Sequence, residues 1–156
     1  STYGGIEMKE ITLQVKANIG EPVYMVSWYD ASNYPEEENP EIKFGLYEDG
    51  YTICSIELDA DGINYYYFSY EKYLVRSDAG MFVSREEFDN FIETMCKDFN
   101  DAHLHKNTIL YVGDNYEPEY IDSAYIDDGR ILIKTNNKNF IYWDELGTEF
   151  YLSKPE

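Results

Sequence analysis

Few residues of this chain have the type and spacing that a catalytic or metal-binding site requires. The two histidines, His103 and His105, stand one residue apart, a spacing that two metal ligands on one strand can have. They also follow a segment with a helical pattern, and cations near a helix C-terminus offset the helix dipole, which is the simpler interpretation. Motifs for binding phosphate or dinucleotides, for zinc proteolysis or for a nucleophilic serine do not occur in the sequence. We therefore expect neither an enzyme nor a cofactor or metal site.

The run from Glu57 to Gly62 resembles the first half of a calcium-binding loop, because acidic residues alternate before a glycine. A complete EF-hand loop needs a glutamate at its twelfth position, where this chain has Phe68, and it needs helices on both sides. A hairpin turn with at most weak, adventitious calcium binding is the better interpretation.

The cysteines and the hydropathy of the chain indicate the cellular compartment in which it is expected. Cys54 and Cys96 lie far apart in the sequence, each within an apolar pattern, which favours two buried free thiols over a disulfide. No apolar run reaches membrane-spanning length, and the first residues lack the pattern of a secretory signal. Residues 1–7 precede the first methionine, Met8, and look like a vector-derived extension. We expect a cytoplasmic protein without membrane contact.

The segment 84–103 carries the only sustained helical period and is expected to brace the rest of the fold. Ser84 followed by Glu87 has the spacing of a capping box at a helix start. Apolar residues at three- and four-residue steps predict one buried face, made of Phe88, Phe91, Ile92, Met95, Cys96 and Phe99.

Most of the remaining chain alternates apolar and polar residues, as strands do, with turn residues between the runs. Three Asp-Gly pairs, at 49–50, 61–62 and 128–129, predict tight hairpin turns. The segment 31–41, with two prolines and four glutamates, predicts an exposed loop. The expected strands are 8–17, 24–29, 42–48, 51–58, 63–70, 108–112, 120–126, 130–135, 140–144 and 149–152.

These elements predict a single α+β domain over residues 8–156. Strands precede and follow the helix in hairpins, and the lack of strand–helix alternation argues against a doubly wound nucleotide-binding sheet. We expect a mostly antiparallel sheet built from hairpins and packed on one long amphipathic helix, residues 84–103.

The strongest functional signal is the net charge of −19, from 31 acidic residues against 12 lysines and arginines. Between residues 17 and 71, 12 acids stand against one cation, Lys43, and the segment 114–128 has six acids, no lysine or arginine, and interleaved tyrosines. Such a surface repels nucleic acid and anionic membranes and attracts basic proteins. Ordinary solubility is the alternative explanation of the charge.

Aromatic residues in the run 65–70 alternate onto both faces of one expected strand. One face then packs in the core, while the other suits an arginine-rich partner through cation–π contact. Core and cross-strand packing of these rings explains the run equally well, and a carbohydrate-binding face is a third interpretation.

In composition the chain is similar to two groups of inhibitor proteins. These are phage or mobile-element anti-defence proteins, such as anti-CRISPR and anti-restriction DNA mimics, and immunity proteins that neutralise nuclease toxins. The likeness implies a small inhibitor that blocks a basic, nucleic-acid-binding effector or nuclease by imitating nucleic-acid charge, without binding nucleic acid itself. The alternatives are an immunity protein bound to its cognate toxin, or a small carbohydrate-binding module or enzyme. The expected partner-binding residues are Glu36, Glu37, Glu38, Glu41, Glu48, Asp49, Asp59, Asp61, Asp114, Tyr116, Glu117, Glu119, Tyr120 and Asp122.

Overall fold

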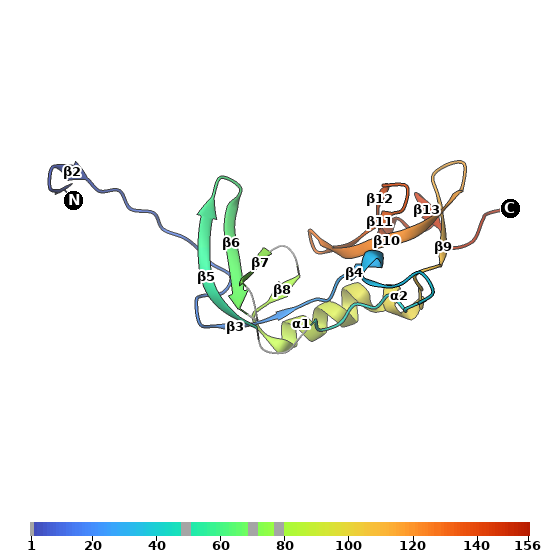
Figure 1. Cartoon of the computed structure of the whole chain (residues 1–156), viewed down its shortest axis with the longest axis horizontal. Helices are drawn as coiled ribbons and strands as arrows, with labels where there is room; N and C mark the ends of the chain where they lie inside the picture. The colour runs from blue at the N-terminus through green and yellow to red at the C-terminus, as the bar shows by residue number, and fades with distance from the viewer. Residues whose placement is uncertain (1, 48–50, 69–71, 77–79) are drawn as a thin grey trace.

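The computed structural model describes residues 2–47, 51–68, 72–76 and 80–156. Two antiparallel sheets and one long helix form the body of the molecule, which confirms the predicted α+β fold. One sheet lies over the helix at one end of the long axis, and the other sheet lies at the other end, with its tall hairpin of β5 (Tyr51–Asp59) and β6 (Gly62–Phe68) (Figure 1).

The first sheet contains the strands that follow the helix in sequence. Its strand order is β12-β11-β10-β9-β13, and β4 also pairs with β10. The predicted strands after residue 103 are therefore confirmed, except that the expected strand 140–144 ends at Tyr142 and a 3-10 helix, Trp143–Glu145, follows it. The elements are β4 (Tyr29–Asp30), β9 (Ile109–Val112), β10 (Glu117–Asp127), β11 (Arg130–Thr135), β12 (Phe140–Tyr142) and β13 (Phe150–Tyr151).

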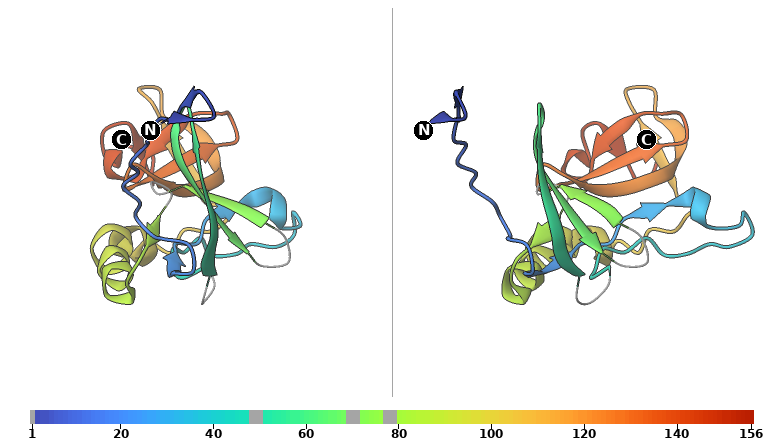
Figure 2. Two further views of the ribbon diagram at one scale, coloured as in Figure 1. Left: turned by 90° about the vertical axis from the view of Figure 1, so that its left-hand side faces the viewer. Right: turned by 60° about the vertical axis from the view of Figure 1, so that its left-hand side comes forward.

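The second sheet has the order β7-β6-β5-β3-β8. The right-hand view of Figure 2 shows its β5–β6 hairpin standing to one side of the β9–β13 sheet. A small hairpin of β1 (Thr2–Tyr3) and β2 (Ile6–Glu7) lies ahead of it at the N-terminus. The elements are β3 (Pro22–Met25), β5 (Tyr51–Asp59), β6 (Gly62–Phe68), β7 (Lys72–Arg76) and β8 (Met81–Phe82).

The helix begins at the predicted place. Ser84 is the N-cap, and its Oγ accepts a hydrogen bond from the Glu87 amide at 3.1 Å, as the first half of a capping box requires. The helical run continues as α1 (Arg85–Phe91), a π-helical turn (Ile92–Cys96) and α2 (Lys97–Asp101). No helix in the described part of the chain is long and apolar enough to cross a membrane.

The π-helical turn changes which residues face the core. Each residue of a π turn advances less around the helix axis than in an α-helix, so the buried position below Phe88 passes from Met95 to Cys96. Cys96 is fully buried, whereas Met95 is 47% exposed. The prediction that Met95 belongs to the buried face is therefore wrong, whereas the predicted burial of Cys96 is confirmed.

The main core lies between the helix and the first sheet. Phe88, Cys96 and Phe99 from the helix meet buried residues of the sheet, and Phe99 packs edge-on against Phe44 and Trp143 at 5.1 Å between ring centroids. A smaller cluster stabilises the second sheet. That second cluster contains Ala17, Val23, Tyr51, Ile53, Tyr65, Tyr67 and Met81.

The structure agrees with one of the three Asp-Gly turn predictions. Asp128 and Gly129 are the two central residues between β10 and β11, with φ of 51° and 71°, so this predicted type I′ geometry is confirmed. In the β5–β6 hairpin, Asp59 pairs with Gly62, so the turn is made by residues 60–61 rather than by Asp61-Gly62. The pair at 49–50 lies outside the described residues.

Three further predictions are wrong. Residues 8–17 form no strand, because no described strand pairs with them, and they extend instead as an arm. In the segment 42–48, residues 42–47 make isolated bridges at most, although Ile42 and Phe44 are buried as a strand pattern predicts. Cys54 is exposed at a register shift in β5, so only Cys96 is a buried thiol, and both cysteines are free.

Candidate functional site

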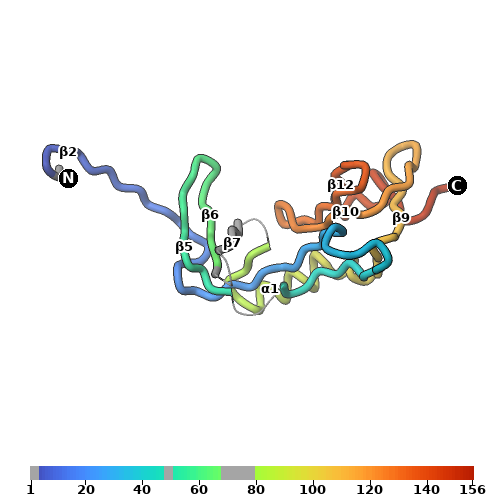
Figure 3. Tube along the Cα trace, viewed as in Figure 1, coloured from blue at the N-terminus to red at the C-terminus, as the bar shows by residue number. Residues whose placement is uncertain are grey.

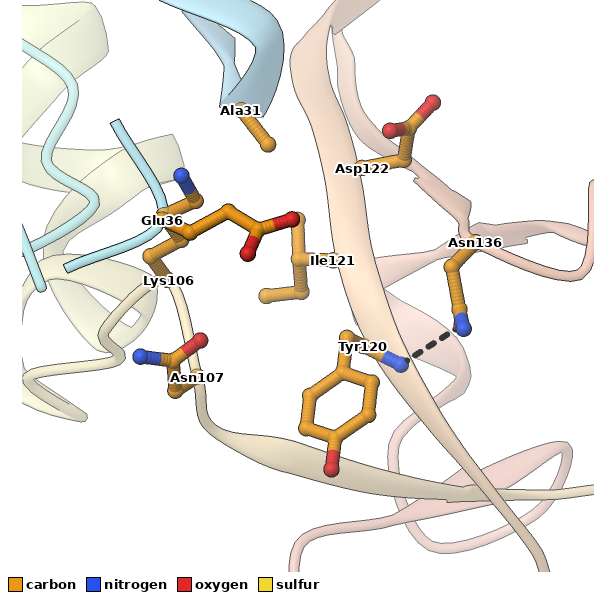
Figure 4. A pocket seen from close by; sticks show the side chains of 8 residues that line it. All are labelled: Ala31, Glu36, Lys106, Asn107, Tyr120, Ile121, Asp122 and Asn136. Carbon is orange, nitrogen blue, oxygen red and sulfur yellow. Dashed lines mark hydrogen bonds between the residues drawn. The ribbon is translucent and has the colours of Figure 1, made fainter. Parts of the chain in front are cut away.

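A groove of about 420 Å³ lies where the acidic loop 31–41 passes β10. Figure 4 shows Glu36 of the loop and Lys106 and Asn107 from the turn before β9 on one side, with Tyr120 and Asp122 of β10 opposite. The groove therefore joins the two most acidic segments of the sequence. Its lining residues are Ala31, Glu36, Lys106, Asn107, Tyr120, Ile121, Asp122 and Asn136.

The pairing of β10 explains the position of this groove. β9 pairs with the first part of β10, up to Tyr120, and β4 pairs with Ser123 and Ala124 along the same edge. Ile121 and Asp122 lie between these two neighbours, at a register shift of the β10–β11 ladder. This irregular step leaves the floor of the groove open to the loop above it.

Lys106 holds the acidic loop close to the sheet. Its ammonium group donates hydrogen bonds to the carbonyl oxygens of Tyr34 at 2.9 Å and Pro35 at 3.0 Å, and its amide donates to Pro40 at 3.0 Å. The ammonium group of Lys106 therefore bonds to backbone carbonyl oxygens of the loop rather than to its glutamate side chains. Glu36, Glu37 and Glu38 between these anchor points stay exposed.

The two histidines contact the same loop. Nδ1 of His103 lies 2.7 Å from a carboxylate oxygen of Glu41, and Nδ1 of His105 lies 3.1 Å from the carbonyl oxygen of Asn39. The Asn107 amide adds a 3.3 Å bond to the Asn39 side chain. The H-x-H spacing therefore serves to attach the loop to the end of the helix.

The loop also has a structured entry from β4. The hydroxyl and amide of Ser32 donate to the Asp30 carboxylate at 2.7 Å and 2.9 Å, which lowers the pKa of Asp30. The rings of Tyr29 and Tyr34 stack with centroids 5.7 Å apart. Burial, and then the nearby groups of Tyr34, Asp30 and Asp122, raise the pKa of Tyr29 to about 12.

Replacing Tyr29 with phenylalanine is expected to leave stability at pH 7 unchanged or raised by about 1 kcal/mol, because the buried Tyr29 hydroxyl has no hydrogen-bond partner among the described residues. The folded-state pKa lies above the ordinary 10.0, so the hydroxyl ionises more readily in the unfolded chain, and stability falls as the pH rises from 10.0 to about 12. Tyr29→Phe should therefore lose less stability over that range in urea unfolding. Tyr34→Phe is the control, and equal alkaline losses in both variants would contradict the prediction.

The predicted contact residues fall in different places. Glu36, Tyr120 and Asp122 come together at the groove. Asp114 and Tyr116 lie in the β9–β10 turn, where the Tyr116 ring packs on Tyr151 at 5.3 Å. The structure exposes Glu37, Glu38, Glu41, Asp59, Asp61, Asp114 and Glu117.

The remaining predicted residues do not line the groove. Asp59 and Asp61 lie at the end of the β5–β6 hairpin, at the other end of the molecule (Figure 1). Glu48 and Asp49 lie outside the described residues. The acidic surface around the groove therefore contains the loop and the middle of β10 only.

Glu119, expected at the contact surface, is 2% exposed. Its carboxyl group accepts hydrogen bonds from the Thr135 hydroxyl and from the Asn139 amide, the latter at 2.9 Å to both oxygens. It connects β10 to the turn after β11 and is not part of the exposed surface.

Sequence reasoning missed Lys106, Asn107 and Asn136 of the groove. Asn136 binds the backbone amide of Tyr120 through its side-chain oxygen at 2.8 Å, as the dashed line in Figure 4 shows. The polar character of these three residues indicates turns. Which strands lie beside those turns depends on long-range strand pairing, and no local sequence pattern indicates that pairing.

In comparisons with protein-family models, with curated proteins and with solved structures, nothing matches this chain.

Proposed function

We propose that this chain is a cytosolic inhibitor that occupies the nucleic-acid-binding site of a basic partner protein. The observation that carries the proposal is the fixed position of the acidic loop 31–41 beside Tyr120 and Asp122 of β10. The contact surface consists of the exposed carboxylates of this loop, the groove and the exposed ring of Tyr120.

Charge explains why such a surface suits a basic partner. The chain carries a net charge of −19, and Glu36, Glu37 and Glu38 have no ion pair with a described cation. Closely spaced carboxylates resemble the phosphates of nucleic acid, and they attract a cationic groove over long range, which raises the association rate.

The rigidity of the loop and the exposed aromatic ring of Tyr120 also contribute to the affinity for the partner. The bonds from Lys106, His105 and Asn107 hold the loop before binding, so little conformational entropy is lost on association. Tyr120 is 43% exposed beside the groove, and tyrosine is enriched among residues that dominate binding energy. The same surface serves an anti-defence inhibitor and an immunity protein, and the identity of the partner separates the two.

The full chain, immobilised as bait in a lysate of the organism that encodes it or its target, tests the proposal. We expect capture of lysine- and arginine-rich nucleic-acid-binding proteins, weaker at 200 mM than at 50 mM salt and prevented by added duplex DNA or RNA. The variant E36Q/E37Q/E38Q should bind the purified partner about tenfold less tightly, and Tyr120→Ala should shorten the lifetime of the complex.

The matched control is E86Q/E93Q/D98N, which removes three charges from the exposed side of the helix. It should retain the affinity of the unmodified chain. Equal loss in both triple variants would assign the effect to net charge alone, and capture that is indifferent to salt and to nucleic acid would overturn the proposal.

A further inference from the structure

The groove beside β10 brings a carboxylate and an aromatic ring together. Figure 4 shows the Glu36 carboxylate reaching from the loop toward β10, with the Tyr120 ring and the Asn107 amide group at the border of the same groove. Figure 3 traces the loop, in light blue, past the segment that leads into β9. The groove of about 420 Å³ has room for a whole side chain of a partner.

The carboxylate and the ring are both accessible, and neither has a cation from its own chain. Glu36 is exposed, and no described cation lies within ion-pair distance of it. The Tyr120 ring is 43% exposed, and none of the described cations lies over it. Lys106 also lines the groove, but its ammonium group bonds to the carbonyl oxygens of Tyr34 and Pro35. A cation from outside can therefore contact both groups.

The chain itself shows which cation suits a ring beside a carboxylate. Cζ of Arg130 lies 3.6 Å from the centroid of the Tyr142 ring, and Nε of the same arginine donates to Asp144 at 2.7 Å. Arg85 lies 5.8 Å from the Phe88 ring centroid and donates at 2.9 Å to a carboxylate four residues further along. Both pairs of groups hold an arginine, because a planar guanidinium group can stack on a ring and donate hydrogen bonds at the same time.

We propose that the groove receives an arginine side chain of the partner protein, with its guanidinium group over the Tyr120 ring and paired with the Glu36 carboxylate. This assignment, which rests on the proposed function, makes the arginine one that the partner otherwise uses to bind phosphate. The groove then provides a specific contact within a surface that attracts the partner by charge.

Arginine fits this groove better than lysine does. The ammonium group of lysine is compact and strongly hydrated, so it pairs with a carboxylate but gains less from an aromatic ring. The Asp122 carboxylate on the β10 side lies 3.8 Å from the ammonium group of Lys134, so it is already partly neutralised. Glu36 is therefore the carboxylate on which the pairing depends, and Tyr120 distinguishes the two cations.

Isothermal titration calorimetry of the full chain with two capped peptides, hexa-arginine and hexalysine, tests the assignment at about 50 mM salt. The peptides carry the same charge, so a difference between them reports the guanidinium group. We expect hexa-arginine to bind about tenfold more tightly than hexalysine. Tyr120→Leu should reduce this preference to about twofold, whereas Tyr120→Phe retains a ring and should keep it.

Two neighbouring acids provide the matched control. E36Q should weaken hexa-arginine binding about fivefold. E37Q removes the same charge from an exposed position that does not line the groove, so it should weaken binding less than about twofold. Nitrogen-15 NMR locates the peptide, and we expect hexa-arginine to shift the side-chain amide signals of Asn107 and Asn136. Circular dichroism confirms that each variant is folded.

Equal affinity for the two peptides, equal losses in E36Q and E37Q, or unchanged amide signals from the groove would each overturn the arginine assignment. These results leave the proposed function standing, because capture of basic proteins from a lysate tests it separately. An arginine preference without salt-sensitive capture would support the assignment and contradict the inhibitor function.

Discussion

Replacing Phe99 with alanine is expected to lower the free energy of unfolding by about 3–5 kcal/mol, the largest effect of any single substitution considered for this chain. Phe99 is fully buried, and its ring contacts Phe44 and Trp143 edge-on. Alanine would remove these contacts and leave a cavity between the helix and the extended segment at Phe44, which cannot close without moving the sheet. Urea unfolding followed by circular dichroism measures the change.

Met95→Ala is the matched control, because the helical pattern alone places both residues on the buried face. The π-helical turn leaves Met95 47% exposed, so its truncation should cost less than about 1 kcal/mol. Similar losses for the two variants would mean that the helix keeps α-helical phase through residues 92–96 and that the π turn is wrong.

Replacing Glu119 with alanine is expected to cost about 2–4 kcal/mol, far more than surface acids usually contribute. The substitution removes the acceptor for the Thr135 hydroxyl and the Asn139 amide, and it leaves space in a site that is 2% exposed. Thr135 is itself fully buried, so water cannot readily replace the lost acceptor. Thermal and urea unfolding both measure this loss.

Glu117→Ala on the same strand provides the comparison, because Glu117 is exposed. It should change stability by less than about 0.5 kcal/mol. Glu119→Gln should lie between the two, since it preserves the size of the side chain and one carbonyl oxygen. Wild-type stability in Glu119→Ala would show that the Glu119 network does not hold the turn after β11.

Local sequence signals predicted much of the fold. The Ser84 cap and the periodic phenylalanines located the helix, and Asp128-Gly129 located one hairpin turn, because each of these features acts within a few residues. The exposed loop 31–41 was predicted by composition alone. Interactions of short range in the chain were therefore accessible without a structure.

The errors come from interactions that the local pattern does not contain. Residues 8–17 alternate as a strand does, but pairing requires a neighbour, and alternation cannot supply one. In the sequence, nothing distinguishes Glu119 from the exposed acidic residues around it. Its burial depends on contacts with Thr135 and Asn139, which lie 16 and 20 residues further along the chain.

The candidate site was predicted only in part for the same reason. Acid content singled out the loop and β10 separately, and the structure brings Glu36 and Tyr120 to one groove. Lys106, which fixes the loop, belongs to a turn about 70 residues away from its acceptors Tyr34 and Pro35. Chain topology, rather than any motif, creates that contact.

The contrasting environments of the two thiols have a practical consequence. Cys54 lies exposed on β5, whereas burial raises the pKa of the Cys96 thiol to about 12 and keeps it out of reach of reagents. A maleimide dye will therefore attach to the native protein at Cys54, on β5 of the second sheet and outside the groove proposed to contact the partner. Fluorescence from that dye offers a way to follow binding of the partner in real time without altering the sequence.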